Sequence, residues 1–86
     1  MAYSIKLEQS VISNDLASIP KSQKEKIKKA IRERLSEEPV KLGKPLRYSL
    51  GGLRRLRVGD WRIIYRINDR VVEIVKIGNR KDVYEG

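Results

Sequence analysis

Residues 53–84, LRRLRVGDWRIIYRINDRVVEIVKIGNRKDVY, decide the fold of this 86-residue chain. Apolar and polar side chains alternate along three runs of this stretch, as they do along strands that bury one face. Short segments of turn-favouring residue types separate the runs. The runs are residues 53–58, 61–67 and 71–77, separated by Gly59-Asp60 and Asn68-Asp69-Arg70. This pattern predicts three consecutive antiparallel strands.

The residues before this stretch predict a short strand and two helices. Residues 3–7 alternate apolar and polar side chains, which favours a strand. Ser10 opens a helical stretch that Pro20 closes, and Ser22 with Glu25 has the spacing of a capping box at the start of a second helix. Apolar residues then repeat every three or four positions, as on a helix with one buried side.

The order of these elements indicates the fold class. Residues 40–45 contain Gly43 and Pro45 and are expected to form an irregular connector. The resulting order β-α-α-β-β-β predicts a single α+β domain over residues 1–86. We expect an N-terminal strand, an antiparallel helical hairpin, and then a three-stranded antiparallel sheet with the hairpin on one of its faces.

Positive charge is concentrated in the second half of the chain. The formal net charge is +9, and residues 1–40 carry eight basic and six acidic side chains, whereas residues 41–86 carry twelve basic and five acidic ones. Arginine outnumbers lysine in the second half, and its planar guanidinium suits bidentate binding of phosphate. A field concentrated in this way favours a polyanionic partner such as RNA. The mixed charges of the first half are typical of solvated helices.

The residue types that are missing exclude several kinds of chemistry. The chain has no cysteine and no histidine, so thiolate chemistry is excluded and the commonest general base and metal ligand are absent. The acidic residues are scattered, which disfavours a metal nuclease; no metal or cofactor is expected. No run approaches roughly 18 apolar residues and no signal-peptide pattern opens the chain, so we expect a cytoplasmic protein that does not enter a membrane.

Strand alternation sorts the arginines by face. Arg62 lies on the opposite side of its strand from Trp61 and Tyr65. Because helices cover only one side of the sheet, we expect Trp61 and Tyr65 to pack under the helices and Arg55 and Arg62 to share the uncovered side. The simpler alternative is that each arginine forms a surface ion pair, worth at most about 1 kcal/mol. This half of the chain has too few acidic residues to pair with all of its arginines.

Two segments carry a resemblance to a known family. The run Arg-x-Gly-Asp-aromatic-Arg-aliphatic-aliphatic-Tyr at residues 57–65 and the tail Arg-Lys-Asp-Val-Tyr at residues 80–84 follow each other in this order. Together with the element order, they resemble the RelE branch of the RelE/ParE toxin superfamily over essentially the whole chain. The resemblance implies a RelE-like fold.

The resemblance also implies catalytic roles for four residues. Arg62 matches the arginine that contacts the scissile phosphate and stabilises the developing negative charge. Arg80 matches the second arginine of the site, and Arg55 matches a basic residue that neutralises the backbone or the leaving group. Tyr84 matches the tyrosine that stacks on a base and assists proton transfer.

One position departs from the family pattern. A lysine usual in the family is replaced here by Leu53, with Arg54 or Lys81 as candidate substitutes, which leaves the general base open. Arg54, Arg57 and Lys81 are the further residues that we expect to bind RNA.

The function implied by the resemblance is that of a messenger-RNA interferase. Such a toxin cuts messenger RNA in the ribosomal A site, beside 16S ribosomal RNA, and so inhibits translation until a cognate antitoxin protein neutralises it. RNA can be cut without a metal by its own 2′-hydroxyl, which leaves a cyclic phosphate, and clustered cations stabilise the anionic transition state. Positioning of the RNA by the ribosome would compensate for a site without histidine.

Two alternatives remain open at this point. The same superfamily includes ParE-like toxins, which poison DNA gyrase and carry no ribonuclease chemistry. Leu53 is also compatible with a catalytically degenerate homologue that only binds RNA.

Overall fold

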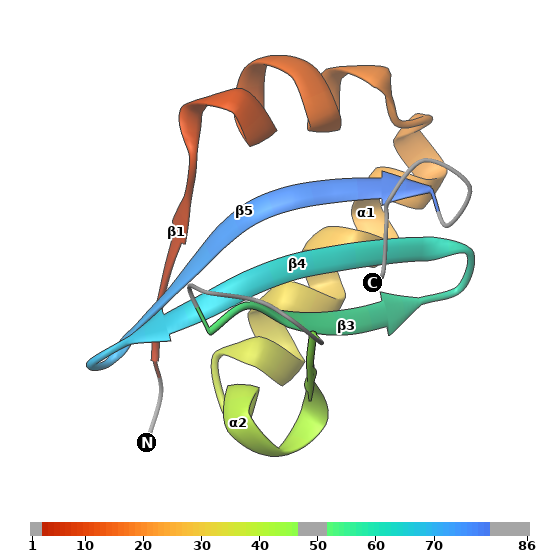
Figure 1. Cartoon of the computed structure of the whole chain (residues 1–86). Coiled ribbons are helices and arrows are strands. Elements are labelled where there is room, and N and C mark those ends of the chain that lie inside the picture. Colours follow the sequence, from red (N-terminus) through yellow and green to blue (C-terminus); the bar gives the residue numbers. More distant parts are fainter. Residues whose placement is uncertain (1–2, 47–51, 80–86) are drawn as a thin grey trace.

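The chain folds into a five-stranded sheet with helical segments on one face and along one edge (Figure 1). The computed structural model describes residues 3–46 and 52–79. The strands are β1 (Ser4–Leu7), β2 (Lys44–Pro45), β3 (Arg54–Val58), β4 (Trp61–Asn68) and β5 (Val71–Asn79), in the sheet order β1-β5-β4-β3-β2. β1 runs parallel to β5, and the other neighbours are antiparallel. The predicted α+β class is confirmed, whereas the predicted extent of the sheet is wrong, because β1 and β2 extend the three central strands on both sides.

The two predicted hairpins are confirmed, and each turn contains a residue in the left-handed region. Gly59 has a φ of 61° between β3 and β4, and Asp69 has a φ of 57° between β4 and β5. Glycine adopts this conformation without steric cost, and aspartate tolerates it better than most residues. The turns therefore fix the β3–β4 register, in which Arg57 lies opposite Arg62.

The second helix covers one face of the sheet. It begins as α1 (Lys21–Ala30) and continues without a break as η3 (Ile31–Leu35), a wider π-helical turn. Its apolar side joins one buried core with the inward residues of the strands. The largest fully buried side chains of this core are Tyr65, Ile27, Leu35, Ile63, Ile74, Val11 and Val72. The predicted capping box is wrong, because Pro20 is the N-cap and no side chain caps this helix.

The first helical segment lies along the edge of β5 rather than beside α1. It consists of η1 (Val11–Asp15) and η2 (Leu16–Ser18), and η1 contacts β5 (Figure 1). The predicted helical hairpin therefore differs in its arrangement.

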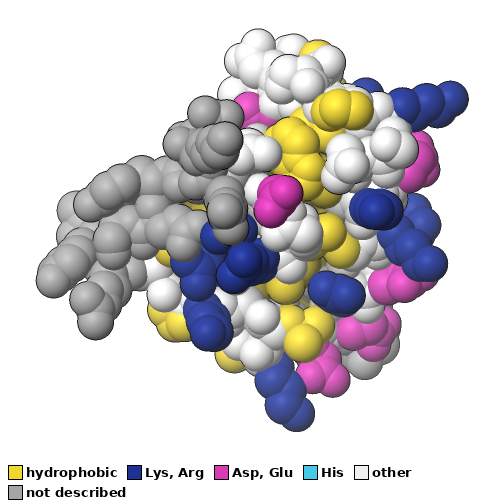
Figure 2. Space-filling view, turned by 90° about the vertical axis from the view of Figure 1, so that its right-hand side faces the viewer, with side chains coloured by type: hydrophobic (Ala, Val, Ile, Leu, Met, Phe, Trp, Pro, Cys, Tyr) yellow, Lys and Arg dark blue, Asp and Glu magenta, His cyan; other side chains and the backbone are white. Residues whose placement is uncertain are grey.

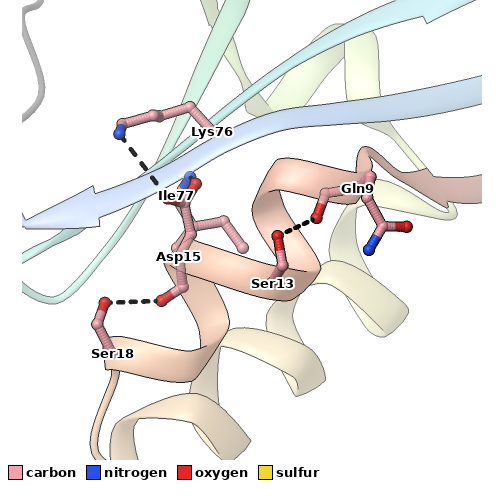
Figure 3. A network of polar contacts seen from close by, with 6 residues as sticks. All are labelled: Gln9, Ser13, Asp15, Ser18, Lys76 and Ile77. Carbon is pink, nitrogen blue, oxygen red and sulfur yellow. Dashed lines mark hydrogen bonds and ion pairs between the residues drawn. The ribbon is translucent and has the colours of Figure 1, made fainter.

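The Asp15 carboxylate fixes η1 to the edge of β5. It accepts a hydrogen bond from the backbone amide of Ile77 at 2.9 Å and lies 3.8 Å from the Lys76 ammonium (Figure 3). β1 pairs with β5 only as far as Ile74. Asp15 thus supplies an acceptor where the neighbouring strand has ended, and an unsatisfied edge amide is avoided.

The predicted irregular connector is in fact ordered. It contains α2 (Pro39–Leu42), with Pro39 at the first helical position, and, after Gly43, the strand β2. Tyr65 of β4 donates a hydrogen bond to the Pro39 carbonyl at 2.5 Å, and Arg54 donates to the carbonyls of Val40 and Gly43 at 2.6 and 3.0 Å. These contacts come from residues far along the chain, which is why local composition did not reveal the ordered segment.

An ion pair on the sheet makes stability depend on pH. Arg66 Nε donates to Glu73 Oε1 at 2.7 Å, and this hydrogen bond lowers the pKa of Glu73 below its ordinary value. The charged form is favoured in the folded state, so the stabilisation is present above the ordinary glutamate pKa and is lost as the pH falls through the lowered value.

We expect Glu73→Gln to remove this pH dependence. Urea unfolding between pH 7 and pH 3 should show a free-energy difference between wild type and variant that shrinks as the pH falls. Glu25→Gln, an exposed change on α1, is the matched control. A difference that stays constant over this pH range would contradict the prediction.

Candidate functional site

Four basic side chains share the face of the sheet that α1 does not cover. In the β3–β4 register Arg57 lies opposite Arg62 and Arg55 lies opposite Ile64, and in the β2–β3 register Lys44 lies opposite Arg55. Directly paired residues project to the same face, with Cβ atoms about 4.5–5.5 Å apart. We call Lys44, Arg55, Arg57 and Arg62 the cationic face.

The cationic face works against the stability of the sheet. Like charges directly opposite each other are destabilising, and this face contains two such pairs, Lys44 with Arg55 and Arg57 with Arg62. Arg62 is also only 6% exposed, so water screens its charge poorly. Residues that break a local stability rule in this way are typical of functional sites.

The surface view agrees with a local concentration of charge. Figure 2 shows several Lys and Arg side chains gathered on one part of the surface, whereas elsewhere on the same view basic, acidic and apolar side chains are interspersed. Within the part of the chain that the structure describes, Lys44 and Arg57 form no ion pair. Their charge is therefore available to an anionic ligand.

Arg66 shows the opposite situation on the same strand face. Its guanidinium pairs with Glu73 and lies 3.7 Å from a carboxylate oxygen of Glu8. Glu73 raises the pKa of Arg66, chiefly through their hydrogen bond. Two acidic neighbours thus neutralise Arg66, and we do not include it in the cationic face.

A pocket of about 200 Å³ opens at the β2 end of the cationic face. Its lining combines three cations with two leucines: Leu42, Lys44, Arg55, Leu56 and Arg57. Leu42 is 44% exposed, so an apolar surface borders the charges. Sequence reasoning missed Lys44, because the segment that carries it was expected to be irregular and only its pairing with β3 brings it to the site.

Arg54 lies on the other side of the sheet from the cationic face. It pairs with Tyr65 across β3 and β4, and its guanidinium is occupied by the backbone carbonyls of α2 and the residue that follows. Burial raises the pKa of the Tyr65 hydroxyl, and the neighbouring Arg54 partly opposes this. In this arrangement Arg54 holds α2 in place, so its geometry fits a positioning role better than the expected RNA contact.

The remaining expected site residues fall into two groups. Arg80, Lys81 and Tyr84 lie outside the described residues. Trp61 packs against the core and its Nε1 donates to Gln23 of α1 at 3.3 Å. The expected places of Trp61 and Tyr65 under the helices are confirmed.

The described residues form neither a cluster of metal ligands nor a membrane-spanning helix. Among residues 3–46 and 52–79, no three carboxylate-bearing residues cluster closely enough to hold a metal ion. No helix in these same ranges is long and apolar enough to cross a membrane.

Comparison with known proteins identifies the family. Residues 6–84 match the model of a family described as ParE toxin of type II toxin–antitoxin systems. The chain is 44% identical over 52 residues to Toxin RelG of Mycobacterium tuberculosis. The aligned residues make up 58% of this chain and 60% of that relative. The chain belongs to the RelE/ParE superfamily of toxins, as the sequence resemblance predicted.

Solved structures agree with this assignment over nearly the whole chain. The RelBE2 toxin–antitoxin complex of Mycobacterium tuberculosis contains a chain that is 30% identical with a TM-score of 0.85, covering 93% of this chain and 100% of that one. The archaeal RelE–RelB complex from Pyrococcus horikoshii gives 31% identity and a TM-score of 0.75, covering 96% and 100%. The RelE-like fold is therefore confirmed.

Proposed function

We propose that this protein is a RelE-type toxin, a metal-independent endoribonuclease that cuts messenger RNA in the ribosomal A site. The observation that supports this most is the cationic face, where like charges are held together at a cost in stability. A phosphodiester between these side chains would relieve their mutual repulsion. Ribosomes as the target imply a protein that acts in the cytoplasm.

In the proposed reaction, the RNA supplies its own nucleophile. The 2′-oxygen forms a bond to the adjacent phosphorus while the bond from phosphorus to the 5′-oxygen breaks. The 2′-proton passes to a base, the 5′-oxygen takes up a proton, and the products are a 2′,3′-cyclic phosphate and a free 5′-hydroxyl. The protein has to stabilise the negative charge that builds up on the phosphorane oxygens.

Arg62 is best placed in this scheme to meet the phosphorane. Burial lowers the local dielectric and strengthens the attraction between its guanidinium and an anion. Arg55 and Arg57, on the neighbouring strand, would neutralise the flanking backbone. By resemblance, Arg80 and Tyr84 complete the site, as the second arginine and as the stacking residue that assists proton transfer.

We also propose a cognate antitoxin protein as partner. The similar chain from Mycobacterium tuberculosis was solved in a toxin–antitoxin complex, and the one from Pyrococcus horikoshii in a RelE–RelB complex. The charge of this chain favours an antitoxin segment that sets acidic side chains against the cationic face or displaces residues 79–86. An inhibitory complex that leaves both regions uncovered would contradict this proposal.

Cleavage of a message on programmed ribosomes tests the function directly. Purified toxin should produce cuts within the A-site codon, detected by primer extension, with and without EDTA.

The second candidate function is that of a ParE-like gyrase inhibitor, because the family model that matches the chain is that of ParE toxins. DNA breakage that depends on gyrase, without any cut in ribosome-bound message, would support that candidate and overturn the ribonuclease proposal. Binding without cuts of either kind would indicate the degenerate RNA-binding homologue.

A further inference from the structure

We propose that Lys44 belongs to the RNA site, and that the pocket between α2 and β3 binds an RNA phosphate next to the scissile one. This inference rests on the proposed function and extends it, because neither the family pattern nor the sequence assigns a role to Lys44. In this assignment Lys44 binds and positions the substrate. The reacting phosphate itself remains with Arg62.

Lys44 lies in a row of cations that leads to Arg62. Lys44 is paired with Arg55 across β2 and β3, and both residues line the same pocket together with Arg57. The β3–β4 register continues this row of cations to Arg62. A strand of RNA that places one phosphate at Arg62 and follows the row would bring a neighbouring phosphate to Lys44, with the exposed Leu42 beside its sugar or base.

The backbone directly before Lys44 is held firmly. Arg54 and Tyr65 bind three carbonyls of the preceding segment, the last of which belongs to Gly43, the residue directly before Lys44. Gly43 packs so closely against the Tyr65 ring that a Cβ atom would overlap it. A long lysine side chain that starts from a fixed backbone loses less freedom on binding.

The family pattern is broken at Leu53. The lysine usual at Leu53 is absent, and Arg54, one of the two candidate substitutes, is engaged with α2 on the covered side. Lys44 lies on the correct face, is exposed, and forms no ion pair within the described residues. It offers the strand-borne cation that the pattern otherwise lacks.

The experiment compares Lys44→Gln with Lys41→Gln. Lys41 lies in α2, only three residues away, its side chain is 82% exposed, and its ammonium lies 3.9 Å from Glu38, so its removal is a matched loss of one charge. Each protein is titrated, over a range of salt concentrations, against ribosomes that carry a message with 2′-deoxyribose in the A-site codon, which cannot be cut by the proposed route. Lys44→Arg serves as the rescue variant, and thermal unfolding checks that all variants are folded.

A contact with one phosphate changes the salt dependence by a known amount. For single-stranded RNA the slope of log K against log salt is about −0.7 per phosphate, so Lys44→Gln should make the slope less negative by about 0.7 and weaken binding about fivefold at 0.1 M salt. Lys44→Arg should restore most of the affinity, and Lys41→Gln should bind like the wild type. Equal binding by wild type and Lys44→Gln, or an equal loss in Lys41→Gln, would overturn the inference.

Cleavage of a normal message by the same proteins separates this inference from the proposed function. If the wild type cuts but Lys44→Gln binds and cuts equally well, the function stands and the role of Lys44 is wrong. If the wild type binds with the expected Lys44 dependence but does not cut, the pocket stands and the ribonuclease proposal is wrong. If the wild type does not bind ribosomes at all, both are wrong.

Discussion

Arg62→Ala is expected to slow single-turnover cleavage on programmed ribosomes by on the order of 10²–10³, the usual effect of removing one donor from a site that stabilises an anionic transition state. Arg62 is 6% exposed and lies on the cationic face opposite Arg57. Its charge is therefore close to any phosphate held there, and water screens it poorly. Arg62→Lys keeps the charge but loses the planar fork, so it should recover only part of the rate.

Two controls make the Arg62 result interpretable. Arg66→Ala changes the same residue type on the same face of the same strand, but its guanidinium is neutralised by Glu73 and Glu8, so it should cut at nearly the wild-type rate. Thermal unfolding of all three variants shows whether a rate change reflects a loss of fold. Unchanged cleavage by a folded Arg62→Ala variant would remove Arg62 from the reaction.

Gly43→Ala is expected to destabilise the fold by about 2–6 kcal/mol, because overpacking costs about 1–3 kcal/mol and the loss of a buried hydrogen bond about 1–3 kcal/mol more. A Cβ atom at Gly43 would lie 1.7 Å from the Tyr65 hydroxyl oxygen and 2.6 Å from the ring carbon that carries it. Tyr65 has no exposed surface and its hydroxyl donates to Pro39. The ring therefore has no space to retreat without breaking that bond.

A double variant and a second glycine test the steric reason. Gly43 has an ordinary φ of −96°, so backbone strain is not the cause. Gly59→Ala, at a φ of 61° with no atom within 4 Å of the added carbon, should cost only about 1–2 kcal/mol. Tyr65→Phe combined with Gly43→Ala should recover part of the loss in urea unfolding, because it removes the nearest atom. A Gly43→Ala variant as stable as wild type would contradict the packing described here.

The parts of the fold that the sequence predicts correctly depend on local signals. Alternation and turn residues define β3, β4 and β5, since each pairs with its neighbour along the chain. The place of β1 beside β5 depends on residues about 67 positions apart, Ser4 with Val71, and no local pattern encodes such a pairing. α2 and β2 were missed for the same reason, because contacts from Arg54 and Tyr65 hold them.

The candidate site shows the same division. Alternation places Arg55, Arg57 and Arg62 on one face correctly, because the short turn at Gly59 leaves little freedom of register. Alternation also places Arg54 on the opposite face from these three. The residue type alone does not predict that its guanidinium donates to backbone carbonyls of the preceding segment. Lys44 reaches the site only through a two-residue strand, which is too short to produce a sequence pattern.

The position of β5 between β1 and β4 has a consequence for the synthesis of this protein. Among the described strands, β1 pairs only with β5. It therefore has no strand to pair with until residues 71–79 have been translated. Pairings between distant residues form slowly, since the loop that joins them must first be closed. β1 therefore joins the sheet late, whereas β2, β3 and β4, which carry the cationic face, can pair with one another before β5 has been made.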